Sequence, residues 1–256
     1  MPSIMSKRIP SSTRLLLSQA SIITILANSA QAVVLTVAED ASVVGQTSAT
    51  LNQNGNTYRG GLFSGVDGII GQDDPSRFYL KFHLPAYTAG TVISSATLTG
   101  YYNDDFNAAD DRTHSFFLAA NDAWTESGIT WNNQPGTVGS ALAVFNAAAV
   151  TPGTSLNWNI TGAANGEYLG DGVLSILLRA DDESLLASNA NWEYFASKEY
   201  NPALAFQLSV TIAAVPEPTT TALVLLALSA GLLSNRRHKR SAAPLSPAPS
   251  SHSRSD

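Results

Sequence analysis

The feature that most constrains the fold is the alternation of side chains at residues 76–84. Apolar side chains occupy positions 78, 80, 82 and 84, and Tyr79, Lys81 and His83 lie between them. A period of two puts successive side chains on opposite faces of an extended strand. This stretch therefore predicts a β-strand with one buried face, and we expect Tyr79, Lys81 and His83 to lie on the other, non-core face.

Further runs with strand character follow one another along the chain. They comprise residues 33–38, 41–44, 92–102, 115–120, 156–160, 173–180 and 203–212. Clusters of Gly, Asn, Asp and Pro separate them, for example at residues 103–111 and 132–136, and residues 161–169 predict one short helical turn. Short strands with almost no helix are typical of an all-β protein. We expect residues 33–213 to form an antiparallel β-sandwich of jelly-roll type.

The composition limits both the interactions that can stabilise this domain and the ligands that it can bind. The chain has no cysteine, so disulfides cannot stabilise it. The net charge of the whole chain is −6, but residues 33–214 have a balance of −12, from six Lys or Arg and eighteen Asp or Glu. An acidic domain argues against nucleic-acid binding. An acidic polysaccharide would need a local basic cleft or bridging cations.

The N-terminus has the three parts of a secretory signal. A basic start, from Lys7 to Arg14, precedes an apolar run at residues 15–27. Ala30 and Ala32 then fit the small-x-small cleavage pattern. We interpret residues 1–32 as a signal peptide, which predicts export through the inner membrane.

The C-terminus, residues 214–240, carries a second targeting pattern. It consists of a rigid Pro-Glu-Pro box, an apolar run at residues 222–233 and a basic cluster. The box and cluster residues are Pro216, Glu217, Pro218, Arg236, Arg237, Lys239 and Arg240. A single hydrophobic helix is expected here, at the short end of the ~17–25 residues that span a bilayer. Residues 241–256 are rich in Ser, Pro and Ala and predict a disordered tail.

This tripartite pattern resembles the PEP-CTERM sorting signal. The resemblance implies recognition of the Pro-Glu-Pro box by an exosortase-type membrane enzyme. It also implies a transient stay in the inner membrane and delivery to the cell surface or the exopolysaccharide matrix. An ordinary C-terminal membrane anchor is the alternative. The chain departs from the family by continuing to Asp256 after the basic cluster.

The most distinctive motif of the domain contains Trp124, Glu126, Trp131 and Asn132. The two tryptophans lie seven residues apart with Gly128 between them, which suits a loop that folds back on itself. In one interpretation the loop is a structural corner that buries both indoles, and Glu126 and Asn132 hydrogen-bond free backbone groups. In the other, the indoles form a stacking platform for sugar rings.

The order of these motifs resembles the DNRLRE domain family. The resemblance uses residues 78–84, 122–135, 159–161 and 195–204 and covers nearly all of residues 33–212. It implies a β-sandwich of jelly-roll type. The family also includes carbohydrate-binding modules that recognise alginate. Tyr79, Lys81 and His83 are candidate glycan contacts because the alternation places them on the non-core face, and a solvated surface without binding is the alternative.

The sequence predicts no catalytic residues. Its acidic pairs lie in turn-like stretches, where Asp makes local hydrogen bonds, and it contains no G-x-S-x-G or H-E-x-x-H motif. Clustered Asp residues are also hard oxygen ligands, so structural calcium is considered, with Asp40, Asp181 and Asp182 as candidates.

The leading hypothesis is thus an exported, non-catalytic β-sandwich protein that binds or organises polysaccharide. A structural or adhesive matrix protein without glycan binding is the first alternative. A polysaccharide-degrading enzyme is the second.

Overall fold

The computed structural model describes residues 30–45, 55–69, 72–106, 113–183 and 191–215. The predicted signal peptide up to residue 29 lies outside this part of the chain. So do the Pro-Glu-Pro box, the apolar run, the basic cluster and the predicted tail. No helix among the described residues has the length and apolar character needed to span a bilayer.

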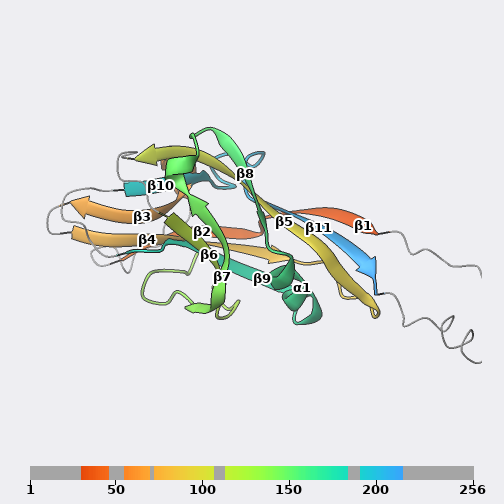
Figure 1. Cartoon of the computed structure of the whole chain (residues 1–256). Coiled ribbons are helices and arrows are strands. Elements are labelled where there is room, and N and C mark those ends of the chain that lie inside the picture. Colours follow the sequence, from red (N-terminus) through yellow and green to blue (C-terminus); the bar gives the residue numbers. More distant parts are fainter. Residues whose placement is uncertain (1–29, 46–54, 70–71, 107–112, 184–190, 216–256) are drawn as a thin grey trace, which may run out of the picture.

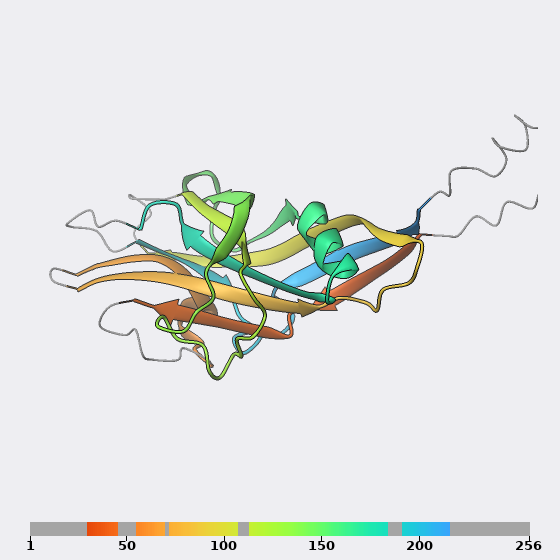
Figure 2. The ribbon, with the colours of Figure 1, turned by 90° about the horizontal axis from the view of Figure 1, so that it is seen from below.

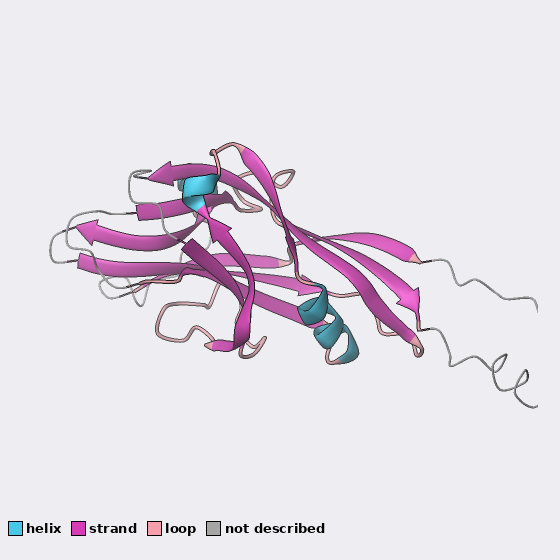
Figure 3. Ribbon diagram, viewed as in Figure 1, coloured by secondary structure: helices cyan, strands magenta, loops and turns pink. Residues whose placement is uncertain are grey.

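The described part consists almost entirely of strands (Figure 3). The strands are β1 (Gln31–Thr36), β2 (Glu39–Val44), β3 (Gly61–Ile69), β4 (Gln72–His83), β5 (Thr91–Phe106), β6 (Thr113–Ala119), β7 (Thr137–Asn146), β8 (Thr154–Asn159), β9 (Val173–Ala180), β10 (Asn191–Ala196) and β11 (Gln207–Ala214). The helical elements are two 3₁₀ turns, η2 (Tyr58–Gly60) and η4 (Ala147–Ala149), and the helix α1 (Thr161–Leu169). The expected helical turn at residues 161–169 is confirmed.

Antiparallel pairing joins the strands into one curled sheet (Figure 1). The order is β1-β11-β5-β10-β3-β4-β9-β6-β7, with β2 paired to β4 and β8 paired to β5. The all-β, antiparallel expectation is therefore confirmed. The expectation of two separate sheets is replaced by a single hydrogen-bonded sheet that curls over its own core, which gives it a sandwich-like form.

The ends of the described domain lie together at one end of the molecule (Figure 2). Strand β1 pairs with β11, so that Gln31 lies opposite Ile212, and β11 in turn pairs with β5, so that Ala214 lies opposite Thr91. Strand β1 begins two residues before the expected mature start at Val33.

The core inside the curl comes from one face of the alternating strands. Phe78, Leu80 and Phe82 of β4 are all fully buried there, as the alternation predicts. The opposite face is a correction to the sequence analysis. Tyr79 and Lys81 are also buried, because residues 124–135 cover this face, and only His83 presents an exposed side chain.

Candidate functional site

Residues 124–135, here called the tryptophan segment, pack on three side chains of β4. Arg77, Tyr79 and Lys81 alternate along this strand and point away from the main core. The Tyr79 hydroxyl donates to the Pro135 carbonyl oxygen at 2.7 Å. Burial raises the pKa of the Tyr79 phenol far above its ordinary value, so the hydroxyl remains a donor.

Trp124 is the buried end of the tryptophan segment. Its indole lies 4.4 Å, measured to the ring centroid, from the ammonium of Lys81, and its Nε1 donates to Ser175 Oγ at 3.1 Å. The same ammonium donates to the Trp124 carbonyl oxygen and pairs with Glu39 at 2.8 Å. The buried Lys81 ammonium is therefore held by one carboxylate, one carbonyl oxygen and the face of one indole ring.

Trp131 is the partly buried end. The Arg77 guanidinium lies 4.4 Å from its ring centroid and forms a two-pronged bond with Glu183, at 2.6 and 2.7 Å. The Asn132 side chain is exposed. Asn133, which the sequence analysis did not select, instead accepts from the Thr130 N–H at 2.7 Å.

The tryptophan segment encloses a shallow pocket of about 320 Å³. Trp124, Ile129 and Pro135 supply apolar lining, and Asn121, Thr125 and Asn133 supply polar groups.

An exposed aromatic surface lies elsewhere, where η2 meets the end of β5 and β10. Tyr58 and Phe106 are 61% and 41% exposed, and Arg59 lies between them. The Arg59 guanidinium carbon is 5.6 Å from the Tyr58 ring centroid and 5.1 Å from that of Phe106. Tyr58, Arg59 and Phe106 are here called the aromatic patch.

Aromatic side chains of neighbouring strands support this patch from below. The Tyr194 ring of β10 packs edge-on to Tyr58, at 6.1 Å between centroids, and lies 6.0 Å from Phe63 of β3. Trp192 packs on Phe63 at 5.4 Å. The patch therefore rests on a packed aromatic layer.

Arg59 is fixed by its backbone as well as by its side chain. It is the one described non-glycine residue with positive φ, at φ 51° and ψ 13°. Its guanidinium pairs with Asp104 at 3.1 Å, and its carbonyl oxygen accepts from Asn103 Nδ2 at 2.6 Å. Left-handed backbone costs about 1–2 kcal/mol in a side-chain-bearing residue, and such strain tends to gather at functional sites.

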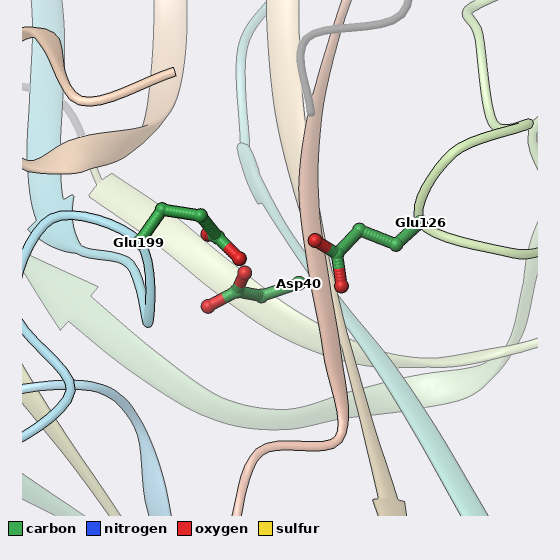
Figure 4. Close-up of side chains that lie close together, drawn as sticks. All are labelled: Asp40, Glu126 and Glu199. Carbon is green, nitrogen blue, oxygen red and sulfur yellow. The ribbon is translucent and has the colours of Figure 1, made fainter. Parts of the chain in front are cut away.

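Three carboxylates from distant parts of the chain meet at a third place (Figure 4). Asp40 of β2, Glu126 of the tryptophan segment and Glu199 after β10 each place an oxygen within 4.8 Å of the others. Burial, reinforced by the Glu199 charge, raises the pKa of Asp40 from 3.8 to about 7, although its bond from the Lys198 N–H opposes this. We call these residues the carboxylate cluster.

Of the predicted calcium ligands, only Asp40 belongs to this cluster. Asp181 and Asp182 follow β9, and both are exposed. Asp181 lies beside the start of β6, where its N–H donates to the Thr113 carbonyl oxygen at 2.9 Å. Asp181 and Asp182 therefore do not join Asp40 in this cluster, and calcium binding by these two residues stays a prediction of the sequence.

A curled all-β domain with an exposed aromatic surface on a packed aromatic layer has the form of a ligand-binding module. The sequence comparison gives the particular family. Carbohydrate-binding module family 96 matches residues 32–211, and the chain belongs to this family.

The other comparisons add little. No curated protein sequence matches the chain. Among solved structures, the K1 cleaved adhesin domain of Lys-gingipain from Porphyromonas gingivalis W83 is 11% identical, with a TM-score of 0.26. The match covers 73% of this chain and 98% of that one. A likeness this low carries no argument about fold or function.

Sequence reasoning missed the aromatic patch because its parts lie far apart in the chain. Tyr58 and Arg59 precede β3, and Phe106 falls within residues 103–111, which were expected to be a turn. The antiparallel pairing of Trp192 with Phe106 and of Tyr194 with Asp104 brings the parts together. Glycan contact by Tyr79, Lys81 and His83 stays a prediction of the sequence.

Proposed function

We propose that this chain is an exported, non-catalytic polysaccharide-binding protein whose aromatic patch contacts the glycan. The fold behind the proposal is a sandwich-like domain of jelly-roll type, akin to the DNRLRE domains. The observation that carries it is the exposed pair Tyr58 and Phe106 on either side of Arg59, in a chain of a carbohydrate-binding module family.

The chemistry of the patch suits a sugar chain. Aromatic faces pack against the apolar C–H faces of pyranose rings, while hydroxyl groups at the ring edge need donors and acceptors. Arg59 supplies guanidinium donors, and Asp104, whose side chain is 41% exposed, supplies acceptors. Because Asp104 already pairs with Arg59, the patch offers both donors and acceptors to neutral hydroxyls.

The sorting part of the proposal rests on the two targeting patterns. The signal peptide would direct export, and the Pro-Glu-Pro box at residues 216–218 would be read by an exosortase-type enzyme in the inner membrane. The protein would then reach the cell surface or the extracellular matrix. The pairing of β1 with β11 is consistent with sorting through the termini, because it places both ends of the domain at the same end of the molecule.

Affinity electrophoresis of the purified protein tests the proposal. The gels contain neutral or uronic-acid polysaccharides, and a polymer-free gel is the reference. Retardation by at least one polymer is expected, without release of reducing ends or unsaturated sugars. Unchanged mobility in every gel would overturn glycan binding and favour the structural matrix protein, whereas product release would favour the enzyme.

A further inference from the structure

We propose that the carboxylate cluster of Asp40, Glu126 and Glu199, together with the Ala38 carbonyl oxygen, binds a divalent cation, with calcium as the natural occupant. The site joins β2, the tryptophan segment and the turn after β10. It lies outside the aromatic patch and does not depend on glycan binding.

The first argument is the state of Asp40. The residue is 2% exposed, and its Oδ2 accepts from the Lys198 N–H at 3.0 Å. Its Oδ1 is buried and has no hydrogen-bond partner among the described residues. An unpaired carboxylate oxygen in the interior is costly, so its presence beside two further carboxylates points to a missing positive ligand.

The second argument is the position that the Lys198 ammonium now takes. It bonds to Glu126 Oε2, lies 3.1 Å from the Ala38 carbonyl oxygen and lies 3.7 Å from Glu199 Oε1. These oxygens already surround one cation. A metal ion at this point would find the same donors and would also be near Asp40.

The third argument is the balance of charge. One ammonium faces three carboxyl groups, so the cluster holds more acidic than basic groups. A divalent ion would offset that excess. The Lys198 side chain is 28% exposed on a flexible four-carbon stem, so it can turn to solvent when a metal takes its place.

The oxygen ligands of the site favour calcium over other metal ions. Carboxylate and carbonyl oxygens are hard ligands that suit calcium, with water completing the six to eight positions it takes at 2.3–2.6 Å. The four protein donors include no nitrogen or sulfur ligand, which zinc and copper prefer. Because Glu126 belongs to the tryptophan segment, a bound ion would hold that segment to β2.

Isothermal titration of calcium chloride into the chelator-treated protein tests the proposal. One bound ion per chain is expected. Asp40→Asn and Glu199→Gln should each weaken calcium binding by about tenfold or more, since each removes a charged ligand. The matched control is Asp171→Asn, which neutralises an exposed aspartate outside the cluster and should leave the affinity unchanged.

The Lys198→Gln variant provides a second test of the proposal. Removing the competing ammonium should tighten calcium binding by about tenfold, a change that a merely structural lysine would not produce. Thermal unfolding with calcium and with chelator shows whether each variant is folded. The proposal is overturned if the wild-type protein takes up no calcium at millimolar concentration. It is also overturned if Asp40→Asn and Glu199→Gln fold and bind calcium as the wild type does.

Discussion

At the scale of single residues, an alternating strand can have two buried faces for different reasons. The even positions of β4 enter the main core, and the odd positions hold the tryptophan segment. Sequence periodicity predicts the burial of the even positions, because apolar side chains recur there at every second residue. It could not predict the burial of the odd positions, since the cover on Tyr79 and Lys81 comes from a loop that begins more than forty residues later.

Replacement of Lys81 tests this account of β4. Lys81→Met should lower the free energy of unfolding by about 2–3 kcal/mol, because the Trp124 carbonyl and Glu39 lose their charged donor. The measurement is urea unfolding followed by tryptophan fluorescence. His83→Met, at the next odd position, changes an exposed side chain and should stay within about 0.5 kcal/mol of the wild type. Equal effects of the two changes would contradict the account.

At the scale of elements, the sequence predicts those strands whose residues have strong β propensity. β1, β2, β4, β5, β6, β8, β9 and β11 were all expected close to where they lie, and so was α1. β3, β7 and β10 were missed. β3 contains three glycines, which weaken the strand pattern, and β7 has mostly exposed side chains, which leaves no buried face to repeat.

Gly65 of β3 faces the backbone of β10 so closely that a side chain at this position would not fit. Gly65 has φ 149°, and a Cβ atom on it would lie 1.9 Å from the Asn191 carbonyl oxygen. Gly65→Ala should therefore separate β3 from β10 and destabilise the protein by about 2 kcal/mol or more, as measured by urea unfolding. Gly136→Ala, whose Cβ would meet nothing within 4 Å, is the control and should change stability by less than about 0.5 kcal/mol. An unchanged Gly65→Ala protein would disprove the close approach.

At the scale of the whole molecule, the strand β5 joins two distant parts of the domain. β5 is 16 residues long, or about 50 Å at about 3.3 Å per residue. Its first residue, Thr91, pairs with Ala214 near the ends of the domain, and its last, Phe106, belongs to the aromatic patch. A protein held or released at its C-terminus would thus present the patch away from the membrane.

The sorting proposal predicts a change in location when the Pro-Glu-Pro box is removed. Replacing Pro216, Glu217 and Pro218 together by Ala should keep the protein in the membrane fraction, since the processing enzyme would lose its recognition box. Immunoblots of membrane, surface and medium fractions measure this. Pro244→Ala, beyond the basic cluster, is the control and should leave the distribution unchanged. Release of the triple variant at the wild-type level would contradict the proposal.

The aromatic patch is the proposed glycan contact, and a comparison of matched tyrosine variants measures its role most directly. Tyr58 and Tyr87 are 61% and 54% exposed, and each packs edge-on to another tyrosine. With the polysaccharide that retards the wild-type protein, the dissociation constant is measured for wild type, Tyr58→Ala and Tyr87→Ala. The account predicts about tenfold weaker binding for Tyr58→Ala, from the lost ring face, and wild-type binding for Tyr87→Ala. Unchanged binding by a folded Tyr58→Ala variant would contradict it.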